Sequence, residues 1–279
     1  MTEYDDEREN LKALTEADLE TASKADKPYQ KKLEQIAQFV LYYLPYMSDK
    51  DTGLVMSDML KIANANDKKQ LDKAISEASE NMDEYSAFTI DRMQSKTRLD
   101  CLESSIAASI LAARSQALKT TATAFKDNAT NGLKGSAGDK AVNQVIDGAV
   151  GSVPFSQRLW QADTTFTSEV NNSIRNALMN GVDVNKINDS LFNFANPVAG
   201  SPTSRAAVHE FNVRRLIVTE NSRIYNDARL QRIKLAGGKY FKVVAEPGYC
   251  KNICAPKLNK VFKIGSDPTP PFHPFVDVR

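Results

Sequence analysis

Cysteine, histidine and tryptophan are scarce in this chain of 279 residues, which has three, two and one of them respectively. A small and odd number of cysteines argues against the disulfide framework of a secreted domain. No apolar run approaches the ~20 residues that a membrane-spanning helix needs. Residues 1–20 are acidic and lack the apolar core of a secretory leader. We therefore expect a protein that is made in the cytoplasm and has no membrane partner.

Charge is nearly balanced overall, at +1, but its distribution along the chain is uneven. Residues 1–26 contain nine acidic and three basic side chains, a net charge of −6. Residues 205–279 contain fourteen basic and six acidic side chains, a net charge of +8. This separation predicts a basic end that meets an anionic partner. DNA held by sequence-independent phosphate contacts is one such partner. An acidic protein surface, or the chain's own N-terminal segment, is the alternative.

Hydrophobic periodicity predicts a mainly α protein with a small α+β C-terminal domain. The N-terminal helices are expected to form a bundle or a long-helix rod. Within them, Pro28 is expected in the first turn of a helix that Pro45 ends. The longest helix of this region is expected over residues 88–125. The chain is divided into four consecutive parts: an acidic arm (1–27), an N-terminal helical region (28–130), a flexible linker (131–154) and a C-terminal domain (155–279).

The C-terminal domain is expected to contain three helices followed by a hairpin. The first two helices cover residues 155–181 and 184–194, with Gly181 between them. A long amphipathic helix follows over residues 205–235. Gly237-Gly238 ends it, because glycine readily adopts the left-handed conformation at a helix C-terminus. Two segments rich in β-forming residues, 239–245 and 260–264, are expected to pair as short antiparallel strands.

Charged residues on the long helix are the first candidate site. Glu220 projects close to the apolar stripe, where a carboxylate must find a partner or change its pKa. It is interpreted as a structural carboxylate bonded to an arginine or a backbone N–H, with a catalytic general base as the alternative. Four arginines lie on the side opposite the stripe and are candidates for DNA binding: Arg214, Arg215, Arg229 and Arg232.

Two cysteines and a histidine near the C-terminus are the second candidate site. Cys250 and Cys254 are spaced C-x3-C, and His273 follows in a proline-rich tail. Zinc takes four ligands in a tetrahedron, so Asp267 or Asp277 would have to complete the set. The alternative is a pair of reduced structural thiols and a histidine held in a turn, since an intracellular chain keeps its cysteines reduced.

The order of motifs in the C-terminal domain resembles that of a known family. A helix–Gly–helix segment around Trp160 and Gly181 precedes the long helix and the hairpin. The long helix and the tail then carry, in order, Thr219-Glu220, Asn226, Ala228, Cys250, Cys254 and Pro270-Pro271-Phe272-His273-Pro274. This order is similar to that of the phage head morphogenesis family, the Mu F-like minor head proteins of tailed phages. The chain departs from the family by C-x3-C in place of C-x2-C, and by Phe275-Val276-Asp277 where the family has a last cysteine.

The resemblance implies a structural minor capsid protein inside the virion. Such a protein assembles in the host cytoplasm, associates with the portal and other head proteins, and acts in head assembly or DNA ejection. It can form an oligomer around the portal and contact packaged DNA without reading its sequence. Two other functions stay open at this stage. One is a virion-carried enzyme that acts on host targets through Glu220 and His273, although no catalytic motif is found. The other is a zinc-stabilised DNA-binding module.

Overall fold

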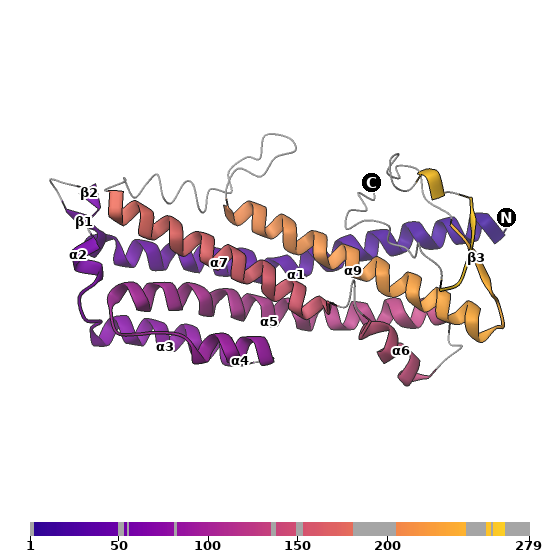
Figure 1. The fold of residues 1–279 in the computed structure, drawn as a ribbon, viewed down its shortest axis with the longest axis horizontal. Coiled ribbons are helices and arrows are strands. Elements are labelled where there is room, and N and C mark those ends of the chain that lie inside the picture. Colours follow the sequence, from indigo (N-terminus) through magenta and orange to yellow (C-terminus); the bar gives the residue numbers. More distant parts are fainter. Residues whose placement is uncertain are drawn as a thin grey trace. The chain divides into compact units, whose positions relative to one another are not determined.

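The computed structural model is mainly helical, with a small two-stranded antiparallel sheet near the C-terminus, which confirms the predicted fold class (Figure 1). It describes residues 3–49, 53–54, 56–80, 83–134, 138–148, 153–180, 205–243, 255–257 and 259–265. The helices in these ranges are α1 (Glu3–Met47), α2 (Met56–Met59), α3 (Ala65–Ser79), α4 (Glu84–Asp91), α5 (Arg98–Leu133), α6 (Asp139–Ile146), α7 (Phe155–Asn180) and α9 (Arg205–Leu235). The strands are β1 (Ser48–Asp49), β2 (Gly53–Leu54), β3 (Tyr240–Lys242) and β4 (Val261–Lys263), and a 3-10 turn covers Ala255–Lys257.

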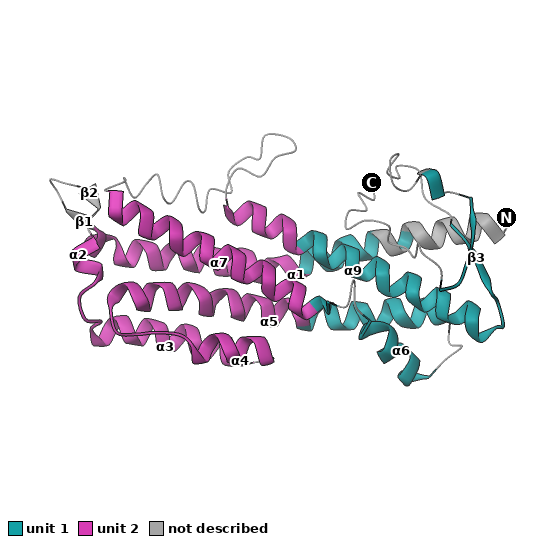
Figure 2. Ribbon diagram, in the orientation of Figure 1, with its two compact units in different colours: residues 1–24, 119–155, 214–279 teal, residues 25–118, 156–213 magenta. Residues whose placement is uncertain are grey.

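The chain forms two compact units, each assembled from segments that are distant in sequence (Figure 2). The boundaries fall inside α1, α5 and α9, so the units do not follow the four consecutive parts expected from the sequence. The expected linker contains the end of α5 and all of α6, because Val142 and Val145 give α6 a buried apolar side. Unit 1 consists of residues 1–24, 119–155 and 214–279; unit 2 consists of residues 25–118 and 156–213.

Two expected helix boundaries in the N-terminal region are wrong. Pro28 and Pro45 both lie inside α1. An internal proline removes a backbone hydrogen bond and costs about 3 kcal/mol or more. In α1 that cost is offset by a stripe of fully buried side chains in the same stretch, which includes Tyr29, Leu33 and Tyr43.

The helix expected over residues 88–125 is in fact two helices, α4 and α5. Thr97 starts α5, because its hydroxyl accepts from the Asp100 N–H and its own N–H donates to the Asp100 carboxylate. Backbone pairing of residues 96–98 with 61–63 holds this junction in place. Of the other expected helices, α7 is present over nearly the predicted range. The one expected over 184–194 lies outside the described residues.

Unit 2 is a bundle in which α5 contacts several neighbouring helices. Its buried side includes Leu102, Ile106 and Ile110. Small side chains on the same helix allow neighbouring helices to approach closely. The buried alanines of α5 in unit 2 are Ala108, Ala112, Ala113 and Ala117. Polar contacts to α4 and α7, described below, fix the positions of those helices around α5.

Unit 1 packs the C-terminal part of α5 against α9, with parts of α1 and α6 alongside. Gly132 of α5 faces Tyr225 and Ala228 of α9 at very close range. Asn128 of α5 donates a 2.9 Å hydrogen bond to the buried carboxylate of Asp18 in α1. These two contacts define how the helices of the unit pack.

Gly132→Ala is expected to destabilise the protein. A Cβ at this position would lie 2.5 Å from the Ala228 Cβ and 2.8 Å from the Tyr225 carbonyl oxygen. Alanine favours a helix by about 0.5–1 kcal/mol, whereas overpacking costs about 1–3 kcal/mol, so a net loss is expected in chemical denaturation. Asn131→Ala, at the exposed neighbouring position, is the control and is expected to be neutral or stabilising. Equal losses in both variants would contradict the close packing.

Asp18→Asn is expected to remove a pH dependence of stability. Burial raises the pKa of Asp18 from 3.8 to about 6, and the hydrogen bond from Asn128 opposes this only in part. The folded state therefore holds a proton more tightly than the unfolded state. The resulting stability is fully present below pH 3.8 and is lost as the pH rises through 6.

This loss amounts to about 3 kcal/mol, since each pKa unit corresponds to about 1.4 kcal/mol. Asparagine stays neutral, so the variant is expected to be more stable than the wild type at pH 7 and to lack this slope when unfolding is followed between pH 4 and 7. Glu16→Gln, at an exposed position of the same helix, is the control. If Asp18→Asn showed the same dependence of stability on pH as the wild type, Asp18 would be excluded as the cause of that dependence.

Candidate functional site

Helix α9 and the turn after it confirm the sequence prediction closely. The helix covers Arg205–Leu235, and Gly237 follows it with φ +79°. The Gly238 N–H donates to the Ile233 carbonyl and the Gly237 N–H to the Lys234 carbonyl, which is the glycine-ended C-cap expected here. Leu235, in the last turn of the helix, is exposed.

The four candidate DNA-binding arginines all lie on α9 in unit 1 but differ in exposure. Arg214 is exposed, whereas Arg215, Arg229 and Arg232 are half-buried. The Arg229 guanidinium lies 5.6 Å from the centre of the Tyr225 ring, at cation–π range. These arginines therefore combine packing against the helix surface with exposed charge.

Glu220 has no exposed surface and is paired with Arg223, one helical turn further along α9. One oxygen of Glu220 accepts from Arg223 Nε at 3.0 Å and from Nη2 at 2.7 Å. The sequence predicted an arginine or backbone partner for this carboxylate. It did not identify Arg223, although the i, i+3 spacing was a usable signal.

Arg223 also connects α9 to the C-terminal end of α6. Its guanidinium donates to the Val145 carbonyl at 3.1 and 3.2 Å and to the Ile146 carbonyl at 3.3 Å, while Nη1 donates to Asp227 at 2.6 Å. The last carbonyls of a helix lack partners within the helix, so a cation placed there satisfies them. Burial by itself lowers the pKa of Arg223, but Glu220 and Asp227 raise it overall. The geometry is that of a structural cross-link.

Glu220→Gln is expected to lower the free energy of unfolding by about 3 kcal/mol. Removing one partner of a buried ion pair costs about 3–5 kcal/mol, and Arg223 keeps Asp227 and two carbonyls, which favours the lower end. Glu169→Gln is the matched control. Its ion pair with Arg205 is about half exposed on both sides, and such pairs contribute under about 1 kcal/mol. Equal effects of the two changes in urea unfolding would contradict the structural role.

The hairpin after α9 carries a concentration of positive charge that sequence analysis did not single out. Between Ala228 and Gly265, the described residues contain eight basic and no acidic side chains. Five of them are exposed to solvent. The eight are Arg229, Arg232, Lys234, Lys239, Lys242, Lys257, Lys260 and Lys263, of which Arg229, Arg232 and Lys257 are half-buried.

Strands β3 and β4 pair in antiparallel register, as predicted, with Phe241 opposite Phe262. The two rings lie 5.7 Å apart, and Phe241 is buried. The pairs on either side, Tyr240 with Lys263 and Lys242 with Val261, point to the other face, because side chains alternate along a strand. One face of the hairpin is thus packed and the other is exposed.

The candidate zinc ligands Cys250, Cys254 and His273, with Asp267 and Asp277, lie outside the described residues. Among the residues that the structure describes, no group of three or more histidine, cysteine or acidic side chains could hold a metal ion. The third cysteine, Cys101, is buried in unit 2, and burial raises the pKa of its thiol to about 11. The zinc hypothesis stays a prediction.

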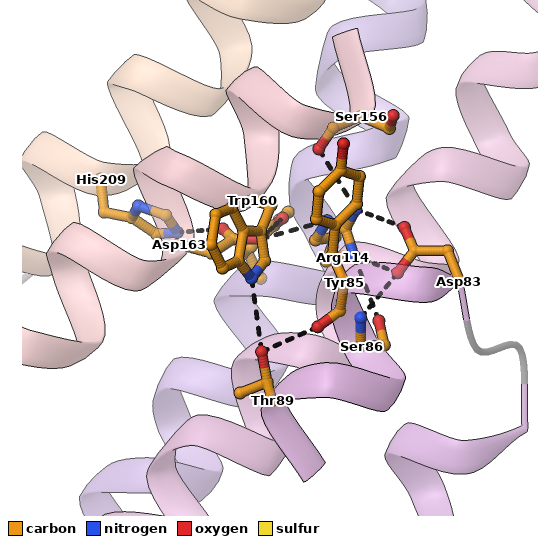
Figure 3. A network of polar contacts seen from close by, with 10 residues as sticks. Asp83, Tyr85, Ser86, Thr89, Arg114, Ser156, Trp160, Asp163 and His209 are labelled. Carbon is orange, nitrogen blue, oxygen red and sulfur yellow. Dashed lines mark hydrogen bonds and ion pairs between the residues drawn. The ribbon is translucent and has the colours of Figure 1, made fainter. Parts of the chain in front are cut away.

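A second polar centre, in unit 2, surrounds Arg114 of α5, which has no exposed surface (Figure 3). Its guanidinium makes a two-pronged ion pair with Asp83 and also donates to the Ser86 hydroxyl at 3.1 Å. A further bond of 3.2 Å reaches the Ser156 carbonyl at the start of α7. Asp83 is at the same time the N-cap of α4, accepting from the Ser86 N–H at 2.8 Å. A single arginine therefore holds the starts of two other helices.

Asp163 of α7 lies on the other side of Arg114, with its carboxylate 3.9 Å from Arg114 Nε (Figure 3). It accepts a 3.1 Å hydrogen bond from the Tyr29 hydroxyl, and His209 Nε2 lies 3.3 Å from it. The His209 ring stacks on Phe166 with centroids 4.5 Å apart. Burial raises the pKa of Asp163, and His209 and Arg114 oppose that rise.

This network joins α1, α4, α5, α7 and α9 within unit 2. Trp160 contributes by donating to the Thr89 hydroxyl at 3.3 Å and stacking on Tyr85. Tyr29, Asp163 and His209 are residue types that serve in acid–base catalysis, yet each is at most 3% exposed. Their arrangement is suited to bracing helices. The sequence signal was available, since Arg114 is the one charged residue between Ser104 and Leu118.

Comparison with known proteins gives no match to a family model, to a curated protein or to a solved structure. Across the described ranges, no helix has both the length and the apolar character needed to cross a membrane.

Proposed function

We propose that this chain is a minor head protein of a tailed phage, a structural component inside the capsid that associates with the portal and with packaged DNA. Support comes from the order of motifs that resembles the phage head morphogenesis family. The long helix, its glycine stop and the hairpin follow one another in the chain, and the Thr219-Glu220 motif lies in the middle of that helix.

The observation that carries a structural role is the burial of Glu220. This carboxylate is the described residue on which an enzymatic function would depend. With no exposed surface and one oxygen that accepts two hydrogen bonds from Arg223, it is a component of the fold. A general base has to reach a substrate proton directly or through one water, which this geometry opposes. The structural function is therefore the better supported of the two.

The proposal includes the place and the partners of the protein. It assembles in the host cytoplasm, enters the head with the portal and other head proteins, and is arranged as an oligomer around the portal. There it acts in head assembly or in DNA ejection. The basic end of the chain faces the packaged DNA, and the buried polar centres keep the helices rigid.

Analysis of purified heads tests this proposal. The protein is produced with an affinity tag in the host cells in which the phage heads assemble. Heads filled with DNA are then purified and examined by quantitative mass spectrometry. We expect a low copy number relative to the major capsid protein, and loss of the chain from heads assembled without portal. An unrelated cytoplasmic protein with the same tag is the control for proteins that are enclosed in heads non-specifically. Absence of the chain from purified heads would overturn the proposal.

A further inference from the structure

The exposed face of the β3–β4 hairpin combines two cations with an aromatic and an aliphatic side chain. Tyr240 and Val261 are 61% and 63% exposed, and Lys242 and Lys263 are exposed beside them. In the register of the hairpin, each lysine is paired across the strands with one of these two residues. Large exposed side chains among lysines indicate a surface that meets a partner with both charged and apolar parts.

Two further exposed lysines, Lys239 and Lys260, lie at the two ends of the hairpin, and strand alternation places them on the side of Phe241 and Phe262. The Ile264 N–H donates to the Lys239 carbonyl and the Val243 N–H to the Lys260 carbonyl, so the ladder continues one residue beyond each strand. Lys239 and Lys260 are exposed. Their backbones are therefore held in the ladder while their charges lie at opposite ends of the hairpin.

The buried side of the hairpin keeps this surface in a defined shape. Phe241 and Val243 are buried, and Phe241 packs on Phe262. Arg232 and Lys234, in the last turn of α9 just before the hairpin in the chain, add positive charge. The carboxylate of Asp227 further up the helix is engaged mainly by Arg223, and it also interacts electrostatically with Lys234.

The chemistry of the surface fits a nucleic-acid backbone. Lysine is a flexible point charge that binds phosphate without the fixed geometry with which arginine reads guanine. A two-stranded antiparallel ribbon has the width that the major groove of a DNA duplex admits. Tyr240 and Val261 can then pack on sugar carbons between the phosphates.

We propose that the exposed face of the β3–β4 hairpin, together with the last turn of α9, binds the phosphate backbone of double-stranded DNA without reading its sequence. This inference rests on the proposed function and locates its DNA contact. The hairpin lysines provide most of the binding, and the half-buried arginines of α9 provide less.

A salt titration of DNA binding by the full chain tests the hairpin. Binding to a short duplex of mixed sequence is followed by fluorescence anisotropy between about 50 and 200 mM salt, where phosphate contacts dominate the change. The test variant is Lys242→Gln and Lys263→Gln combined, the two lysines of the exposed face. The control variant is Lys68→Gln and Lys69→Gln combined, which removes the same charge from exposed positions of unit 2.

The hairpin variant is expected to reduce the slope of log K against log salt by about 2, since each lost phosphate contact changes it by about 1. The control variant is expected to keep the wild-type slope. Thermal unfolding followed by circular dichroism shows whether each variant is folded, and Lys242→Gln alone, with an expected slope change of about 1, provides a milder test.

Three results would overturn the inference. They are absence of DNA binding by the wild type at low salt, equal slope changes in the hairpin and control variants, and tighter binding to single strands than to duplex. The outcome is separable from that of the head analysis. A chain found in heads whose hairpin variants bind DNA like the wild type leaves the minor head proposal intact. Hairpin-dependent DNA binding by a chain absent from heads removes only that proposal.

Discussion

An arginine with no exposed surface has to be paired inside the protein, because an isolated charge in an apolar interior costs far more than a domain's net stability. Arg114 meets this requirement with Asp83, Ser86 and the Ser156 carbonyl. Its partners belong to α4 and α7, so pairing the charge also sets where those helices begin. This requirement acts together with the packing of the large apolar side chains of α5, such as Leu102, Ile106 and Ile110, in setting the arrangement of unit 2.

The same physical logic operates in unit 1 on a smaller scale. Arg223 is buried, and its guanidinium donates hydrogen bonds to the carboxylates of Glu220 and Asp227 and to the last carbonyls of α6. A helix as short as α6 has little intrinsic stability. Its attachment to α9 therefore depends on this guanidinium as well as on Val142 and Val145. In both units, one cation from a long helix organises elements that are distant in sequence.

Burial separates the charges of the chain into two groups with different roles. Glu220, Asp163 and Arg114 are enclosed, and their bonds go to other parts of the fold. The hairpin lysines are exposed and carry their charge on the surface. This division supports a protein whose polar interior holds long helices rigid while its basic end meets an anionic partner, which is the role proposed for it in a phage head.

Local features of the sequence were sufficient to predict the mainly helical fold class, the limits of α9, its glycine stop and the pairing of the two strands. Each of these depends on periodicity or on the conformation of glycine, which act over a few residues. Pro28 and Pro45 were misjudged because the burial that offsets an internal proline comes from other helices. The partner of Glu220, the Arg114 network, the two interleaved units and the exposed face of the hairpin were decided by the tertiary structure. The physical reason is that desolvation depends on which distant segments come together, and local sequence patterns do not contain that information.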